Sequence, residues 1–412
     1  MLAVAAAASG QTPLLLSFSP QQIAAGSGDT KIKISGYGLT ATMQLLWNGQ
    51  PRTTEFVNQF LLKATIPQSD TAKPTLAQIT VVDTASAQSI GQPTPVLVYL
   101  PVAHNDLVYD SARSKIYLSV SKQDGNGPAL AIVNADAGLV ERYIALPSEP
   151  RPLAVSADST YLYIGMADRI RRMDLTGASA DVDIPASSFQ LSPSGGAPFS
   201  FSPQSLLPLP SPSTSFVLIA SISGFQQGFV VDGTKVRPKY SNSPGNCLVG
   251  TPDGITIYSG PGLQVTKLLS DGLPYTPDHA NSALVVGPAC PVYTGGLIFS
   301  SGGDVVDPVS GSRVRWLPAV GNVASSANPS LAFFIDRLGG SATGVPSLRF
   351  ETFDASSGAL LKSIPLGIQM DVSNGGAVLG RLLHWGTDGF AFGNYTTLNS
   401  LTANWLYLIH VN

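Results

Sequence analysis

Charged residues are scarce in this sequence. Asp, Glu, Lys and Arg make up 12% of the 412 residues, about half the usual share of roughly 25%. The 23 basic and 26 acidic residues nearly balance, and no basic run is present. Proteins that bind nucleic acid need such a positive footprint, so we expect no nucleic-acid partner. The densest basic group, Arg169, Arg171 and Arg172, is interpreted as a solvated strand edge.

Side chains that commonly perform chemistry are also few. The sequence has four histidines and two cysteines, and it contains no G-x-S-x-G, H-E-x-x-H or P-loop motif. We therefore expect no catalytic residues, no metal site and no cofactor. His104 and His384 are kept as candidates for lining a channel built from distant segments of the chain, because a histidine can serve there as a general base. A structural role is favoured for each of them.

The two cysteines, Cys247 and Cys290, lie 43 residues apart. In an oxidising compartment they could form a disulfide, and two buried free thiols are the alternative. No histidine or second cysteine pair accompanies them, so a metal site is not expected.

Long apolar runs are missing as well. No segment approaches the roughly 18 apolar residues needed to span a bilayer, and we expect no membrane span. Residues 1–10 form a short apolar stretch that ends in small residues, similar to the tail of a signal peptide with cleavage near Ala8. The alternative is an irregular N-terminus of a cytosolic protein, without the function of a signal peptide. Low charge and this stretch together predict a secreted, extracellular or cell-surface protein.

The residues that are abundant predict an all-β fold. Hydrophobic residues make up 44% of the chain, which is enough for buried cores. The 41 glycines and 32 prolines are spread throughout, as the turns of many short strands require. No long run has helical periodicity.

Residues 11–100 predict a β-sandwich of about seven short strands. The dipeptide Asn48-Gly49 is a strong hairpin signal. Several motifs occur in order: Ser19-Pro20, Gly26, Ser35-Gly-Tyr-Gly-Leu39, Trp47-Asn-Gly49, Thr54, Phe56-Val57 and Leu62-Lys-Ala-Thr-Ile-Pro67. This order resembles the IPT/TIG immunoglobulin-like module of bacterial surface proteins. The resemblance implies a spacer or adhesion module without an active site.

The first apolar strand of this module is a candidate for contact between subunits. Its apolar residues are Leu14, Leu15, Leu16 and Phe18. The ordinary interpretation is that the strand completes its own sandwich. The alternative is that it adds to the sheet edge of a neighbouring copy and forms a head-to-tail chain.

Residues 101–412 contain a repeat. Seven apolar runs recur at about 46-residue intervals, in the range of propeller blades: Ile116–Val120, Tyr161–Gly165, Phe216–Ala220, Ile255–Tyr258, Leu297–Ser300, Leu331–Ile335 and Phe390–Phe392. Most are followed by a strand that ends in Asp and a Gly-containing turn, as at Asp136, Asp174, Asp232, Asp307 and Asp354. We interpret these Asp residues as acceptors of turn N–H groups and the glycines as positions of positive φ.

This order of strands and turns resembles the YVTN-type bacterial propeller, most clearly over residues 104–177. We predict a seven-bladed β-propeller, with six or eight blades as alternatives. The last blade has only three strands in the sequence, and a segment near Val96–Ala103 is predicted to supply the fourth.

The expected function is that of a non-catalytic surface protein for binding, adhesion or self-assembly. Its partners would be a protein or glycan at the cell surface, or copies of itself. The alternative is a propeller lactonase or lyase that acts on a small ester, lactone or sugar at the central channel.

Overall fold

The computed structural model describes residues 12–190, 199–242, 244–245, 247–259, 263–276, 279–280, 290–324, 328–336, 347–369, 379–398 and 401–411. The predicted signal-peptide segment, residues 1–10, lies outside the described residues. The described part is all-β, with two short 3-10 turns, and none of its helices is long and apolar enough to cross a membrane. The chain divides into two compact units: Met1–Leu100 with Leu366–Ile368, and Pro101–Pro365 with Gln369–Asn412.

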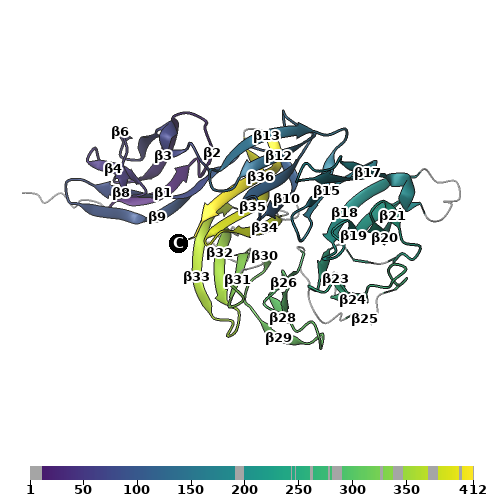
Figure 1. Ribbon diagram of the computed structural model, residues 1–412. Helices are drawn as coiled ribbons and strands as arrows, with labels where there is room; N and C mark the ends of the chain where they lie inside the picture. Colours follow the sequence, from purple (N-terminus) through teal and green to yellow (C-terminus); the bar gives the residue numbers. More distant parts are fainter. Residues whose placement is uncertain are drawn as a thin grey trace, which may run out of the picture. The chain divides into compact units, whose positions relative to one another are not determined.

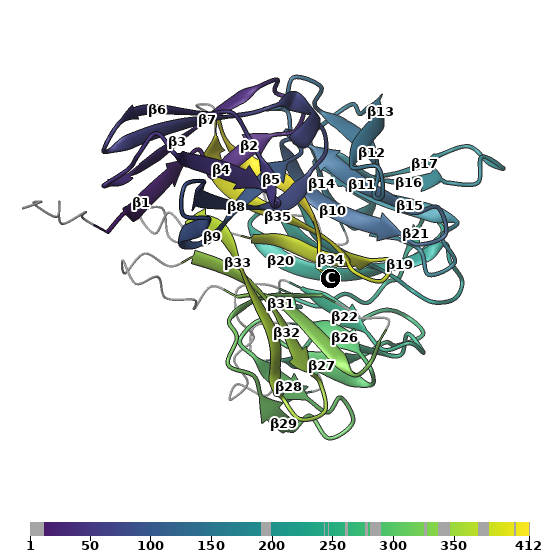
Figure 2. The same cartoon turned by 90° about the vertical axis from the view of Figure 1, so that its left-hand side faces the viewer.

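The first unit contains two sheets, of order β1-β3-β7-β6 and β2-β9-β8-β4-β5 (Figure 2). Their strands are β1 (Leu14–Ser19), β2 (Gln22–Ala24), β3 (Thr30–Tyr37), β4 (Met43–Trp47), β5 (Gln50–Pro51), β6 (Thr54–Asn58), β7 (Leu61–Ile66), β8 (Thr75–Asp83) and β9 (Gln88–Tyr99), with the 3-10 turn η1 (Gln68–Asp70) after β7. Alternate side chains of both sheets enter one apolar core, for example Ile34 of β3 and Ile79 of β8. The unit is therefore a two-sheet β-sandwich.

The hairpin predicted at Asn48-Gly49 is present between β4 and β5. Both residues have positive φ, 48° and 79°, and Trp47 pairs with Gln50. Two successive positive φ angles are the mark of a type I′ turn, which Asn-Gly adopts with little strain.

Two expectations about the ends of this unit are decided by strand pairing. Strand β1 pairs antiparallel with β3 of the same chain, and Phe18 is buried in the sandwich core. Within a single chain, β1 therefore completes its own sandwich, which was the ordinary interpretation of this strand. The predicted closing strand is wrong: Val96–Tyr99 belong to β9, which pairs with β8 and β2. Their backbone groups are already used in the sandwich.

The second unit consists of seven successive antiparallel sheets over its described residues (Figure 1). The first sheet contains β10 (His104–Asp110), β11 (Lys115–Val120), β12 (Ala129–Asn134) and β13 (Leu139–Ala145). The second contains β14 (Pro150–Val155), β15 (Tyr161–Met166), β16 (Arg169–Asp174) and β17 (Val182–Pro185), and is followed by η2 (Ala186–Phe189). The third contains β18 (Phe201–Pro208), β19 (Ser215–Ile222), β20 (Phe225–Asp232) and β21 (Lys235–Val236).

The remaining sheets are β22 (Leu248–Gly250), β23 (Thr256–Ser259), β24 (Gln264–Lys267), β25 (His279–Ala280); β26 (Val292–Thr294), β27 (Leu297–Phe299), β28 (Asp304–Val306), β29 (Arg313–Trp316); β30 (Gly321–Ala324), β31 (Leu331–Asp336), β32 (Ser347–Asp354), β33 (Leu360–Gln369); and β34 (Leu379–Trp385), β35 (Gly389–Leu398), β36 (Leu401–His410). The last sheet has three strands in the described part of the chain.

First strands of neighbouring sheets contact one another at six of the seven junctions, and at the seventh, between β26–β29 and β30–β33, the two sheets share an apolar cluster that contains Val305 and Val323. Strand β10 contacts β14, β14 contacts β18, β18 contacts β22, β22 contacts β26, β30 contacts β34, and β34 contacts β10. The contact of the last sheet with the first gives a ring of radially arranged sheets. The second unit is therefore of the β-propeller type.

The seven apolar runs found in the sequence coincide with the second strands of these sheets, to within one residue at Ile255 and Ser300: β11, β15, β19, β23, β27, β31 and β35. Glycine has positive φ in the turn after the third strand at Gly138, Gly177, Gly233, Gly311 and Gly358. Second strands are central in their sheets and carry the strongest apolar signal, because both of their faces are covered.

The acidic turn residues are only partly as predicted. Asp354 accepts the N–H groups of Ser356 and Ser357, at 3.0 and 2.6 Å. The hydroxyl of Ser356, which donates to the same carboxylate at 2.6 Å, and these N–H groups lower the pKa of Asp354 to about 2. In the first sheet of the second unit, the prediction that Asp136 accepts the turn N–H is wrong. Asn134 is the acceptor there, for the N–H of Ala137 at 2.9 Å, because the capping position is the last residue of the third strand.

Candidate functional site

A β-bulge recurs where three first strands begin. In β10 the residues Asn105 and Asp106 together face Ser119, and in β34 the residues Gly380 and Arg381 together face Gly393. Strand β14 has the same irregularity opposite Gly165. A bulge bends its strand and redirects side chains.

The residue opposite each bulge has to be small. A Cβ at Gly165 would lie 2.7 Å from Cγ of Pro152, and one at Gly393 would lie 2.5 Å from Nδ2 of Asn404. Both distances are too short for an ordinary contact. In β11 the equivalent residue is Ser119, whose hydroxyl accepts the N–H of Asp106 at 2.8 Å and donates to the carbonyl oxygen of Arg151 at 2.8 Å.

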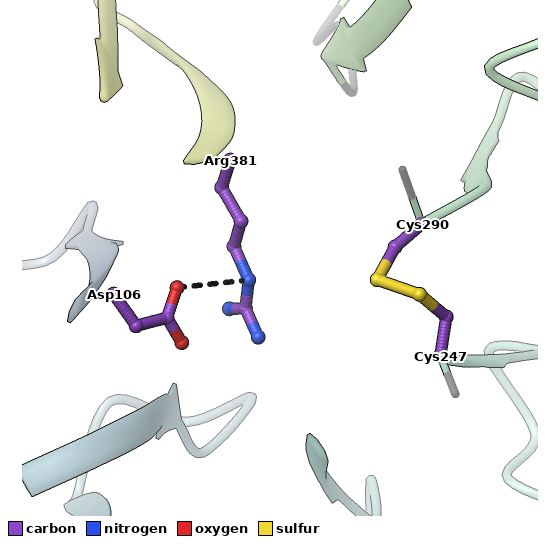
Figure 3. The surroundings of a disulfide bond; sticks show 4 residues. All are labelled: Asp106, Cys247, Cys290 and Arg381. Atoms are coloured by element: carbon purple, nitrogen blue, oxygen red, sulfur yellow. Dashed lines mark ion pairs between the residues drawn. A yellow bond between two sulfur atoms is a disulfide. The ribbon is translucent and has the colours of Figure 1, made fainter. Parts of the chain in front are cut away.

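Asp106 and Arg381 occupy equivalent bulge positions and point toward one another (Figure 3). Nε of Arg381 lies 3.4 Å from Oδ1 of Asp106, and its Nη1 donates to the carbonyl oxygen of Leu153 at 3.2 Å. The carboxylate also accepts the N–H groups of Leu107 and Leu153, each at 2.9 Å. One ion pair thus joins three consecutive first strands, β34, β10 and β14.

Burial raises the pKa of Asp106, and the charge of Arg381 and the two N–H groups oppose that rise. The side chains of Asp106 and Arg381 are 15% and 33% exposed. Because each carboxylate oxygen already has a partner, Asp106 is poorly placed to act as a free general base.

A second set of polar contacts lies beside this pair. Nδ2 of Asn105 donates to Oε1 of Glu149 and to the carbonyl oxygen of Pro150, both at 2.8 Å. Oε2 of Glu149 accepts the N–H of Lys122 at 2.8 Å. These bonds connect the first and second sheets at the end where their first strands begin.

Cys247 and Cys290 form a disulfide, with their Cα atoms 5.2 Å apart. Cys247 directly precedes β22, and Cys290 lies two residues before β26. The bond therefore joins the starts of the first strands of two neighbouring sheets (Figure 3). The 43-residue spacing noted in the sequence corresponds to one repeat.

The two candidate histidines lie in packing positions. His104 is buried, with Nδ1 3.2 Å from the carbonyl oxygen of Val102 and Nε2 3.4 Å from Nδ2 of Asn404 in β36. Burial lowers its pKa to about 4. The ring of His384 stacks on Phe390, with centroids 4.7 Å apart. Both rings therefore lie in packing contacts.

No metal-binding group emerges from the part of the chain that the structure describes: no three His, Cys, Asp or Glu side chains are grouped to hold an ion. The basic group of β16 is neutralised locally, since Arg169 and Arg171 both pair with Asp183 at 2.6 and 2.8 Å. Arg172 lies over the ring of Tyr161 at 5.0 Å.

Sequence reasoning did not single out Asp106 and Arg381. Both directly precede an apolar pair at the start of a first strand, Leu107-Val108 and Leu382-Leu383. An alignment of the repeats on those pairs places opposite charges at one position in the first and last repeats. That is the signal that could have found them.

Comparisons with known proteins show likenesses in structure only. No family model matches the chain, and no curated protein sequence matches it. A functionally unknown protein from Desulfotomaculum acetoxidans is 12% identical, with a TM-score of 0.45, over 70% of this chain and 92% of that one.

Two further structures are of the propeller type. The dihydro-heme d1 dehydrogenase NirN is 15% identical, with a TM-score of 0.43, over 81% of this chain and 71% of that one. A quinonprotein alcohol dehydrogenase-like protein from Bacteroides thetaiotaomicron is 13% identical, with a TM-score of 0.39, over 86% and 96%. At TM-scores below 0.5, these likenesses carry no argument about what this chain does.

Proposed function

We propose that this protein is a secreted, non-catalytic binding protein of the bacterial surface. The observation that supports the proposal is the pairing of the ionisable residues at the first strands. Asp106 is satisfied by Arg381 and two N–H groups, and neither His104 nor His384 has a carboxylate partner among the described contacts. General acid–base catalysis needs a group free to exchange a proton with substrate.

The architecture behind this proposal is an immunoglobulin-like module and a seven-bladed propeller. Two sheets of four and five strands around one core support the first part, together with the ordered IPT/TIG-like motifs. Seven sheets, each with one repeat strand at its second position, support the second part. Such domains offer large rigid surfaces for partners.

The alternative activity, an esterase, lactonase or lyase, is tested with purified protein and its Asp106→Asn variant. The substrates are p-nitrophenyl acetate, γ-butyrolactone and p-nitrophenyl glycosides. We expect both proteins to give the buffer rate. Turnover by the wild type that is lost in Asp106→Asn, with the melting temperature retained, would overturn the proposal.

The binding role itself is tested by sedimentation of fluorescently labelled protein with intact bacterial cells. We expect saturable co-sedimentation, and light scattering of the free protein shows whether copies of the chain are the partner instead. A protein that stays in the supernatant and remains strictly monomeric at high concentration would contradict both binding and self-assembly.

A further inference from the structure

The outer face of the sheet β1-β3-β7-β6 has an unusual composition. Strands β3 and β7 alternate strictly, with Ile32, Ile34, Leu62 and Ala64 turned to the core. The residues between them face outward. They include Lys31, Lys33 and Tyr37 of β3, and Lys63 of β7. Figure 2 shows these strands side by side in the sandwich.

Three lysines crowd together on this face. Lys33 lies directly opposite Lys63 on the neighbouring strand, and Lys31 lies two residues further along β3. Neighbouring strands are about 4.8 Å apart, and residues two apart along a strand about 7 Å. Like charges in directly opposite positions destabilise a sheet. The arrangement therefore has a cost that the fold itself does not require.

These lysines lack acidic partners in the described part of the chain. Glu55 of β6 faces Lys63 in the strand register, but no ion pair forms between them. Elsewhere in the same unit, Arg52 is paired with Asp70. In the second unit, Arg169 and Arg171 share Asp183. Three ammonium groups against the one carboxylate of Glu55 leave this face positive, although the chain as a whole has a net charge of −3.

The opposite end of the same face is apolar and aromatic. Leu14 pairs with Tyr37 across β1 and β3, and the rings of Tyr37 and Phe60 meet edge to face with centroids 5.7 Å apart. These three side chains are 54%, 45% and 48% exposed. Ser35 lies between the lysines and Tyr37 on β3. Exposed apolar groups gathered beside polar ones are typical of a binding surface.

We propose that this Lys–Tyr face, defined by Lys31, Lys33, Lys63, Tyr37 and Phe60, binds an anionic polysaccharide whose sugars carry carboxylate or sulfate groups. The ammonium groups pair with the acidic groups of the chain, and sugar rings lie against the exposed aromatic rings. An extended polymer can reach both the lysines at one end of the sheet face and the aromatic rings at the other end. The inference rests on the binding role proposed above and gives it a surface and a ligand class.

Nucleic acid and acidic peptide are the competing polyanions. Both would use the three lysines. A nucleic-acid site needs a larger positive footprint than three lysines in a protein with nearly balanced charge. An acidic peptide could pair with the lysines but has no sugar rings to lie against Tyr37 and Phe60. The aromatic end and the hydroxyl of Ser35 favour the sugar polymer.

The full chain is tested by biolayer interferometry against immobilised polygalacturonate, amylose, poly-L-glutamate and oligo-dT. We expect binding to polygalacturonate, weaker at 150 mM than at 25 mM NaCl because salt screens exposed charges, and no binding to amylose. Lys33→Gln/Lys63→Gln should raise the Kd about tenfold, and Tyr37→Ala should raise it severalfold. The matched control Lys73→Gln/Lys122→Gln changes the net charge equally, at exposed lysines that are not among the residues of the face, and should leave the Kd within twofold.

Folding is separated from binding by the melting temperature. It should stay the same or rise in Lys33→Gln/Lys63→Gln, because that variant removes an opposed like-charge pair. Equal losses in the test and control doubles would overturn the inference. So would equal affinity for oligo-dT or poly-L-glutamate combined with no effect of Tyr37→Ala, or no binding to polygalacturonate at all. If Lys33→Gln/Lys63→Gln still co-sediments with cells, the face is wrong but the binding role stands.

Discussion

Between the sheets β14–β17 and β18–β21, fourteen described residues are buried in one apolar cluster. The cluster between β22–β25 and β26–β29 has six. The strands differ in the same direction: β19 and β20 have eight residues each, whereas β22, β26 and β27 have three. The disulfide lies at the second of these junctions. A covalent bond therefore joins two sheets whose described apolar cluster is small, although the neighbouring junction between β18–β21 and β22–β25 has five buried residues and no disulfide.

Around β10, neighbouring sheets are joined in a third way, besides apolar packing and the disulfide. Here the Asp106–Arg381 pair and the bond from Asn105 to Pro150 join first strands, and His104 contacts Asn404 of the third strand β36. The comparison teaches that equivalent positions of one repeat can be stabilised by packing, by an ion pair or by a disulfide.

The largest expected effect comes from removal of the disulfide. The Cys247→Ser/Cys290→Ser variant opens a 43-residue loop, and loop entropy then predicts a loss of about 4 kcal/mol in the free energy of unfolding. Chemical denaturation with and without reductant measures it. Reductant should affect the wild type and leave the double variant unchanged. A loss below about 1 kcal/mol would show that packing, not the bond, stabilises this junction.

The pH dependence of stability sharpens the comparison at β10. The pKa of His104 is lowered to about 4 in the folded protein, against about 6.5 in the unfolded chain. A depressed folded pKa means that the unfolded chain binds the proton first. The contribution of the neutral His104 to the free energy of unfolding is therefore complete above pH 6.5 and is lost as the pH falls toward 4. It amounts to about 3 kcal/mol.

Urea denaturation between pH 4 and 7 tests this, with His104→Gln as the comparison. The difference between the two proteins in the slope of the unfolding free energy against pH isolates His104 from the other groups that titrate between pH 4 and 7. Identical slopes would place the imidazole in contact with water in the folded state.

The smallest of the three effects concerns the ion pair. Asp106→Asn should lower the free energy of unfolding by about 2 kcal/mol, less than for a fully buried pair because Arg381 is one-third exposed. Asp106→Leu/Arg381→Met should recover part of this loss, since it leaves no unpaired charge. A double-mutant cycle by thermal denaturation measures the coupling. Additive effects would mean that the pair does not join these strands.

Local sequence was most informative at turns and in central strands. Asn48-Gly49 encodes its turn through two residues that tolerate positive φ. The seven apolar runs predicted all seven second strands, because a central strand has to be apolar on both faces. In the first sheet the turn acceptor was assigned to Asp136 instead of Asn134, because two residues of similar chemistry stand two positions apart and only the strand end distinguishes them.

The predicted closing strand failed for a related reason. The Val96–Ala103 region has the apolar pattern of a strand, but pattern alone does not say which sheet receives it. In the structure Val96–Tyr99 pair with β8 and β2. Strand partners far apart in sequence depend on the packing of the whole unit.

The sequence by itself determined an all-β chain, a sandwich-like first hundred residues and a repeat of about 46 residues, since periodicity and turn residues are local properties. Only the tertiary structure decided that Asp106 meets Arg381 across some 275 residues, that Cys247 bonds to Cys290, and that Lys33 lies opposite Lys63. Each of these depends on strand register and on the order of sheets around a ring. Both are set by the burial of the whole unit rather than by neighbouring residues.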